Sequence, residues 1–503
     1  MTKAYYALIA AVLLIGVGYV LSQGVVSASP AVSKTQVVEL ASGDTYDLVA
    51  DEVTKVINGV EHTMLAYNGS IPGPTIRVQQ GSEVTINFTN NTSMRTLLHS
   101  HGVRMDNPFD GAHTSQMEME SGETFAYKLK FPDAGVYWYH PHVREDYQQE
   151  LGMYGAFIVE PAEPDYLPLV NREEVLFLDD ILVEGGDINL SESGADHTLM
   201  GRFGNVMLVN GQEDYVLEAR RDEVVRLYII NSANVRPFNF AIKGAKMKLV
   251  GADNGAYERA TFVDAVTLGP SERAIVDVLI TEPGTLINDT PAGLTLLGSI
   301  AVTDGPLEKS YAAEFNTLQA SALTSASIDP FRQYFAAAPD KKIALTVDMM
   351  GMGGHMMPDG TMMGGMMGGV PEGGIEWEDD MAMMNSMATT DSVQWHIVDQ
   401  AGKRDMDIDW AFKKGEPVKI RIFNDPESMH PMQHPIHFHG QRFLVVTRDG
   451  VPQTNLVWKD TVLVKAGETV DIVLDTSNPG LWMAHCHIAE HLESGMMFTY
   501  RVE

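Results

Sequence analysis

The chain has 503 residues, 45% of them hydrophobic, with 35 Lys and Arg against 67 Asp and Glu and a net charge of -32. This length predicts roughly two to four domains, because a single core seldom grows so large. So acidic a surface disfavours nucleic acid and anionic membranes as partners, while it favours cations and solubility. The one cysteine, Cys486, excludes an intramolecular disulfide.

Residues 1–30 are typical of an export signal. Lys3 precedes an apolar run of 18 residues from Ala4 to Leu21, and small residues at 26–28 form a cleavage site. The run is also just long enough to span a bilayer as an uncleaved anchor. Both alternatives place the domains outside the cytoplasm, in the periplasm, in the medium or on the outer face of a membrane. No later segment resembles a transmembrane helix.

The sequence after residue 30 predicts many short strands. Apolar residues alternate in "EVTINFTN" (83–90), "VVRLYIINS" (224–232) and "PVKIRIFN" (417–424), and 45 Gly and 24 Pro are spread along the length. This pattern predicts an all-β protein built from sandwiches or barrels. We expect three domains, at 35–161, 165–305 and 341–503, with a linker at 306–340, and a monomer.

A methionine-rich segment interrupts the third block. Residues 349–388 hold 13 of the 29 methionines, many glycines and an acidic patch at 376–380. So much Gly argues against a packed core, and so much Met argues against a plain linker. This composition favours a segment that captures soft metal ions. The alternative is that the segment is a flexible, oxidation-prone lid without a role in metal binding.

Ten histidines fall into four clusters, two near the start and two near the end of the chain. They are His99 and His101 in "LHSHG", His140 and His142 in "WYHPH", His434, His437 and His439 in "HPIHFHG", and His485, His487 and His491 in "HCHIAEH". Side chains two residues apart on a strand share a face, so each His-x-His pair presents two imidazoles together. One such pair is weak evidence, but four pairs supply eight nitrogens, enough for a cluster of several coppers between the first and last blocks.

Cys486 lies between His485 and His487 and must therefore point to the opposite face. On that face the Cys486 thiolate would be joined by the imidazoles of His434 and His491 and the weak thioether ligand of Met496. Together they are the ligand set of a blue-copper electron-transfer site. The backbone around Cys486 is then a short covalent electron path between the two copper sites. Zinc fits poorly, because its closed sites have four ligands and not one thiolate among ten histidines.

These four motifs, in this order and spacing, resemble those of the multicopper oxidase family, the group of laccases, ascorbate oxidase, ceruloplasmin and cuprous oxidases. The resemblance covers the chain after residue 30 and implies three cupredoxin-like Greek-key domains. It also implies four copper ions, one type 1, one type 2 and a type 3 pair, which take electrons from a donor and reduce O2 to water.

The resemblance also assigns the ligands. It gives the type 1 copper His434, Cys486, His491 and an axial Met496; the type 2 copper His99 and His437; and the type 3 pair His101, His140, His142, His439, His485 and His487. It makes Asp110 in "DNPFDGAHTSQ" an aid to proton delivery, with a turn-forming Asp-Gly as the alternative. Many bacterial members carry Glu directly after the last type 1 histidine. Leu492 stands there here, so Glu490 or Glu493 would have to take its place.

The electron donor is open from the sequence. Thioethers prefer Cu(I), and the resemblance to Met-rich cuprous oxidases of copper tolerance makes Cu(I) the leading expectation. Candidate Cu(I) ligands are Met349, Met350, Met352, Met429 and Met432. Met432 matches a substrate ligand of those enzymes, although His430 stands where they carry Asp, and packing is its alternative. A laccase-like oxidase of phenols, or of Fe(II) or Mn(II), is the competing enzyme, and a non-catalytic copper store is a different class. Copper nitrite reductase is opposed by the third block and by the HCH motif at the C-terminal end.

Overall fold

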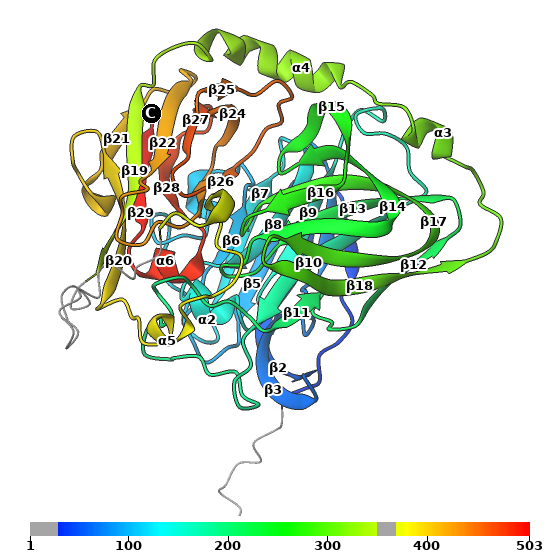
Figure 1. Cartoon of the computed structure of the whole chain (residues 1–503), viewed down its shortest axis with the longest axis horizontal. Coiled ribbons are helices and arrows are strands. Elements are labelled where there is room, and N and C mark those ends of the chain that lie inside the picture. The colour runs from blue at the N-terminus through cyan, green and yellow to red at the C-terminus, as the bar shows by residue number, and fades with distance from the viewer. Residues whose placement is uncertain (1–28, 350–368) are drawn as a thin grey trace, which may run out of the picture.

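The computed structural model describes residues 29–349 and 369–503. Almost all of the expected leader lies outside these residues, as do Met350 and Met352. The prediction of an all-β fold is confirmed, because the described chain is built from strands in five sheets and its helices are short (Figure 1). No helix within the described ranges is long and apolar enough to cross a membrane.

The first part of the chain forms two sheets around one core, which includes Leu48, Phe88, Tyr127 and Trp138. The five-stranded sheet consists, in order across it, of β1 (Val37–Leu40), β4 (Thr75–Gln79), β9 (Gly155–Glu160), β8 (Gly135–Pro141) and β6 (Leu98–His101). The four-stranded sheet consists of β3 (Val60–Tyr67), β2 (Thr45–Ile57), β5 (Glu83–Asn90) and β7 (Thr124–Lys130). On β5 every second residue is buried, as its alternating sequence predicts.

The middle of the chain forms one large sheet of nine strands, which lies on the right in Figure 1. They are β10 (Arg172–Ile181), β11 (Val206–Val209), β12 (Tyr215–Arg220), β13 (Glu223–Asn231), β14 (Phe238–Ala252), β15 (Gly255–Val263), β16 (Ala265–Leu268), β17 (Arg273–Thr290) and β18 (Gly293–Thr303). The expected alternation of exposure at 224–232 is not found, because every residue of β13 is buried. β13 lies between β10 and β17 and is covered on both faces.

The last part again forms two sheets around one core, which includes Trp395, Phe438, Trp482 and Cys486. The six-stranded sheet consists of β20 (Val393–Asp399), β19 (Lys341–Met349), β22 (Val418–Asn424), β27 (Thr469–Asp475), β24 (Arg442–Arg448) and β25 (Val451–Pro452). The five-stranded sheet consists of β21 (Asp409–Phe412), β29 (Met497–Val502), β28 (Gly480–Cys486), β23 (His434–Phe438) and β26 (Thr461–Val464).

Short helices fill the connections. They are η1 (Asn107–Phe109), α2 (Glu145–Gln148), α3 (Ala312–Phe315), α4 (Ala322–Ile328), η2 (Asp329–Tyr334), η4 (Glu372–Gly374), α5 (Ala382–Asn385), η5 (Asp405–Asp407) and α6 (Ala489–Glu493). Residues 306–340, expected as a linker, carry α3, α4 and η2 across the top of Figure 1. Ser321 caps α4 by accepting a hydrogen bond from the Thr324 amide. α2, from the first part, packs against α6, from the last.

Candidate metal centre

Two pairs of strands carry the histidine clusters. β6 and β8 are antiparallel, with His99 opposite His140 in the register. β23 and β28 are antiparallel too, with His437 opposite His485. The second histidine of three of the pairs follows directly after its strand ends. Every one of the ten histidines is buried.

The eight histidines of the four pairs gather in one place. Ring nitrogens of His142, His439 and His485 lie within 4.8 Å of one another, and so do those of His101, His140 and His487. A third group joins His99, His101 and His437. Since His99, His101, His140 and His142 come from the first part of the chain and the others from the last, the cluster lies between these two parts.

The nitrogens that face the middle of this cluster fit metal ligation. Among the described residues, the inner nitrogens Nε2 of His99, His140 and His437, Nδ1 of His101 and both nitrogens of His487 have no hydrogen-bond partner. Nε2 of His439 lies only 3.0 Å from Nε2 of His485 and 3.3 Å from Nε2 of His142. Burial lowers the pKa of His99, His439 and His485 to about 3, so these imidazoles are neutral and keep a lone pair for a metal.

The outer nitrogens are held by acceptors. Asp110 receives hydrogen bonds from two of these histidines: its backbone oxygen lies 2.7 Å from His99 Nδ1, and its carboxylate lies 2.9 Å from His439 Nδ1. Asp460 does the same for two others, with its carboxylate 3.0 Å from His101 Nε2 and its backbone oxygen 2.8 Å from His437 Nδ1. Such partners fix the tautomer and the orientation of a ligating imidazole.

A second group lies on the opposite face of β28. Cys486 Sγ is 3.5 Å from His434 Nδ1 and 3.9 Å from His491 Nδ1, and these two nitrogens are 3.3 Å apart. α6, which follows β28 directly, supplies His491. Burial raises the pKa of the Cys486 thiol, so it would ionise only with a cation beside it. Three soft or borderline donors converging in a dry site suit copper.

Two further buried residues lie next to this group. Met496 is fully buried, and its backbone is tied to both neighbours: its amide donates to His491 and its carbonyl accepts from Cys486. Trp395, from β20, stacks on His491 with ring centroids 4.2 Å apart and lies edge-on to His434 at 4.7 Å. Sequence analysis missed Trp395, because no spacing marks an aromatic residue on a separate strand.

Comparison with known proteins agrees with this geometry. Three sequence models of the multicopper oxidase family match residues 49–164, 178–285 and 378–503. This chain belongs to the multicopper oxidase family. It is therefore an oxidoreductase with O2 as acceptor and four copper ions as cofactors, as predicted.

Two curated relatives and one solved structure illustrate the likeness. Multicopper oxidase MmcO of Mycobacterium tuberculosis is 27% identical over 86% of this chain and 82% of its own length. Copper resistance protein A of Escherichia coli is 25% identical over 92% and 93%. The structure of a multicopper oxidase from Campylobacter jejuni covers 94% of this chain and 95% of its own, with a TM-score of 0.70 at 23% identity. The predicted cupredoxin-like fold is thereby confirmed.

Asp110, expected to assist proton transfer in this multicopper oxidase, is fully buried, and burial raises the pKa of its carboxyl to about 6. The Asp-Gly turn is present as well. Gly111 has φ +74°, and a Cβ there would lie 1.8 Å from the Leu98 carbonyl oxygen. The Asp-Gly turn therefore lies close against β6. Proton delivery by Asp110 stays a prediction.

The carboxylates expected to replace the missing glutamate lie on α6. Glu490 is buried, with a pKa raised to about 8 chiefly by burial, and its Oε1 lies 3.4 Å from Nδ2 of Asn234. Glu493 is half-buried, and burial raises its pKa to about 7. Leu492 between them is buried. None of the described hydrogen bonds joins Glu490 or Glu493 to a histidine of the cluster, whereas Glu145, which sequence analysis missed, lies against His142.

The Met candidates for substrate binding differ in position. Met432 is fully buried in the core and Met349 ends β19 in the same core, whereas Met429 is 43% exposed. The burial of Met432 agrees with its packing alternative. Its neighbour His430 is buried, and neither ring nitrogen has a partner among the described residues. Burial lowers the pKa of His430 to about 4 despite the nearby Asp380.

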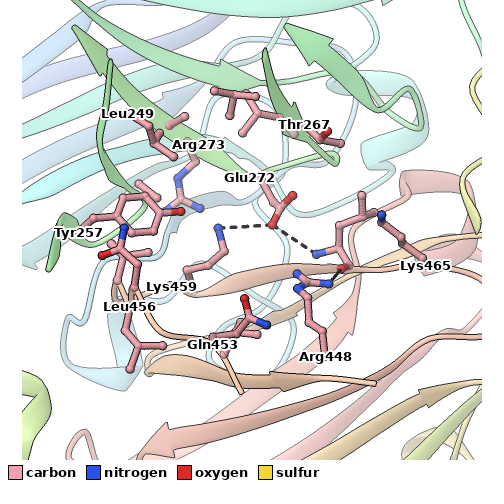
Figure 2. Close-up of a pocket in the computed structure, with 18 of the residues that line it drawn as sticks. Leu249, Tyr257, Thr267, Glu272, Arg273, Arg448, Gln453, Leu456, Lys459 and Lys465 are labelled. Carbon is pink, nitrogen blue, oxygen red and sulfur yellow. Dashed lines mark hydrogen bonds and ion pairs between the residues drawn. The ribbon is translucent and has the colours of Figure 1, made fainter. Parts of the chain in front are cut away.

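A cavity of about 330 Å³ opens elsewhere, between the middle sheet and the strands β24 to β26 (Figure 2). Its charged groups are largely paired: Lys459 lies 3.3 Å from Glu272, and Arg448 lies 2.9 Å from Glu468. The cavity lacks the histidines. Its wall includes Arg273, whose guanidinium donates to Asp460 behind it at 2.6 Å.

Proposed function

We propose that this multicopper oxidase oxidises Cu(I), one electron at a time, and contributes to copper tolerance outside the cytoplasm. His434, Cys486, His491 and Met496 would hold the type 1 copper. His99 and His437 would hold the type 2 copper. The type 3 pair would take the remaining six ligands: His101, His140, His142, His439, His485 and His487.

The side chains of this site have separate tasks. Bound copper supplies the one-electron chemistry and the reduction of O2. Cys486 shares its backbone with His485 and His487, so the two groups of ligands are joined by the shortest covalent path that the chain can offer. Asp110 and Asp460 hold the outer nitrogens of four histidines, and burial keeps water away from the imidazoles. Asp110 also lies where it can pass a proton to the cluster.

One observation supports Cu(I) as the donor: the part of the Met-rich segment after residue 368 is hydrogen-bonded next to the proposed type 1 ligands. The Glu376 amide donates to Gln433 Oε1 at 2.7 Å, and Gln433 precedes His434. Glu376, Asp379 and Asp380 form an acidic group there, in which burial and then the charges of Asp380 and Asp379 raise the pKa of Glu376. A cation is attracted to such a group, and methionine thioethers favour Cu(I). The name of the relative copper resistance protein A points the same way.

The test replaces methionines without changing the length of the chain. The eight methionines between β19 and Gly369 are exchanged for Ser: Met350, Met352, Met356, Met357, Met362, Met363, Met366 and Met367. O2 consumption is then measured with Cu(I) and, separately, with a phenol. We expect kcat/KM for Cu(I) to fall about tenfold or more, as expected when metal-binding groups are lost, while phenol turnover stays unchanged.

Two controls frame this comparison. A variant with Ser at the exposed Met117 and Met406, outside the segment, should keep both activities. Cys486→Ser should lose the blue absorption and turnover of every donor. If phenol is the better donor, and the eight-methionine variant oxidises Cu(I) normally, the protein is a laccase-like oxidase and the proposed donor is wrong.

A further inference from the structure

In six of the eight clustered histidines, the ring nitrogen that points away from the cluster has an oxygen atom as hydrogen-bond acceptor. Asp110 and Asp460 hold those of four, as described above. His140 Nδ1 donates to the Pro141 carbonyl at 2.7 Å, and His485 Nδ1 donates to the Cys486 carbonyl at 2.8 Å. Only His142 and His487 lack such a bond among the described residues.

His142 has a carboxylate beside it instead. Its Nε2 faces His439, while its Nδ1 lies 3.4 Å from Oε1 of Glu145. This distance is a few tenths of an ångström longer than a hydrogen bond. Glu145 is fully buried, and neither carboxylate oxygen has a hydrogen-bond partner among the described residues.

The local fold explains how Glu145 reaches this position. His142 ends the "HPH" run after β8, and α2 begins at Glu145, three residues later. α2 packs against α6, so the Glu145 side chain is enclosed between the two helices and close to Asp146 and Glu493. A buried carboxyl group without a hydrogen-bond partner is unfavourable.

We propose that Glu145 is a positioning residue for the type 3 copper pair: its carboxylate accepts the Nδ1–H of His142 and so directs the Nε2 lone pair into the cluster. Glu145 thereby does for His142 what Asp110 does for His439. This inference rests on the proposed assignment of His142 as a ligand. It does not depend on the electron donor.

The experiment compares substitutions of Glu145 in the copper-loaded enzyme. Copper retained per chain is measured against a competing chelator, together with the near-ultraviolet absorption of the coupled pair and the blue band of the type 1 site. In Glu145→Leu we expect type 3 copper to be held roughly 10–100-fold more weakly, with the blue band unchanged. Glu145→Gln should retain the copper, because its amide oxygen still accepts a hydrogen bond.

The matched control is Glu150→Leu. Glu150 is another buried carboxyl group at the end of the same turn, and its Oε1 lies 3.5 Å from the Leu182 amide and bonds no histidine. This variant should keep the type 3 signal. Wild-type copper retention in Glu145→Leu would overturn the proposal. Equal loss in the Gln variant, or in Glu150→Leu, would overturn it as well.

A His142→Ala variant tests the assignment of His142 as a ligand separately from the positioning role of Glu145. His142→Ala should itself lose the type 3 signal. If it does not, the ligand assignment fails, and the role of Glu145 fails with it. If His142→Ala loses the signal and Glu145→Leu does not, only the positioning role is wrong.

Discussion

Asp110 and Glu145 show what single residues add to the histidines. The spacing of the four His-x-His pairs predicts which imidazoles point together, and the structure gathers all eight. The acceptors behind them follow no spacing: Asp460 and His101 are 359 residues apart in the chain. Only a fold can bring such residues together. The gathering of the histidines could therefore be predicted from the sequence, whereas most of the residues that orient them could not.

Asp110→Asn should lower kcat with either donor by roughly 100-fold or more, the usual contribution of a group that transfers protons. The Asn side chain can still accept the hydrogen bond from His439, and the backbone oxygen still accepts the one from His99, but an amide cannot deliver a proton. The KM for the electron donor should not change, because the donor is oxidised at the type 1 side. Steady-state O2 consumption measures both constants.

Asp106→Asn is the control for this variant. Asp106 lies four residues away but pairs with Lys130 at the surface, so its loss should leave kcat as it is. An Asp110→Asn enzyme with wild-type kcat, or with a changed KM alone, would contradict the role given to Asp110.

Among the elements, the short helices are the least predictable. α2, α5 and α6 have four or five residues each, too few to show a helical period and too short to be stable alone. α2 and α6 pack against each other beside the histidine clusters, and α5 is held by hydrogen bonds between Asn385 and the backbone of Met200 and Gly201. The strands, by contrast, could be predicted from alternation except where both faces are covered, as in β13.

The acidic group after η4 predicts a pH dependence. Burial, Asp380 and Asp379 raise the pKa of Glu376 from 4.5 to about 7. Glu376 is therefore neutral at pH 6 and ionised at pH 8, and it attracts a cation only at the higher pH. Its ionisation also disfavours the folded state, so its contribution to stability falls as pH rises from 4.5 to about 7.

Comparison with Glu376→Gln isolates this effect. The KM of the wild type for Cu(I), divided by that of the variant, should fall between pH 6 and pH 8. The same ratio for a neutral phenol should stay constant. A ratio for Cu(I) that does not change with pH would remove Glu376 from the donor site.

At the scale of the whole molecule, Arg273 joins all three parts of the chain. It lies at the start of β17, donates from Nε to the Val136 carbonyl of β8 at 3.1 Å, and pairs with Asp460 beside β26. Both charged groups are fully buried. The division into three domains stays a prediction from the sequence. The contacts that the middle of the chain makes could not be predicted, because they come from single residues that belong to no motif.

Arg273→Met should destabilise the protein by about 3–5 kcal/mol, because the Asp460 carboxylate is left buried without its partner. The thermal unfolding midpoint of the copper-loaded enzyme measures this loss. Arg221→Met is the control, since Arg221 pairs with Asp304 in solvent, where an ion pair contributes little to stability. Similar midpoints for the two variants would show that Arg273 does not hold the three parts together.

The chain on both sides of residues 350–368 is fastened to the last part of the fold. β19 pairs with β20 and β22 before them. After them, the Gly374 carbonyl accepts a hydrogen bond from the Ala466 amide near β26, and Arg236 donates to Glu378 at 2.8 Å. The described chain before and after these residues thus forms an insertion point with two fixed ends. A peptide selective for another redox-active ion, grafted there, would turn the enzyme into a sensor whose readout is oxygen uptake.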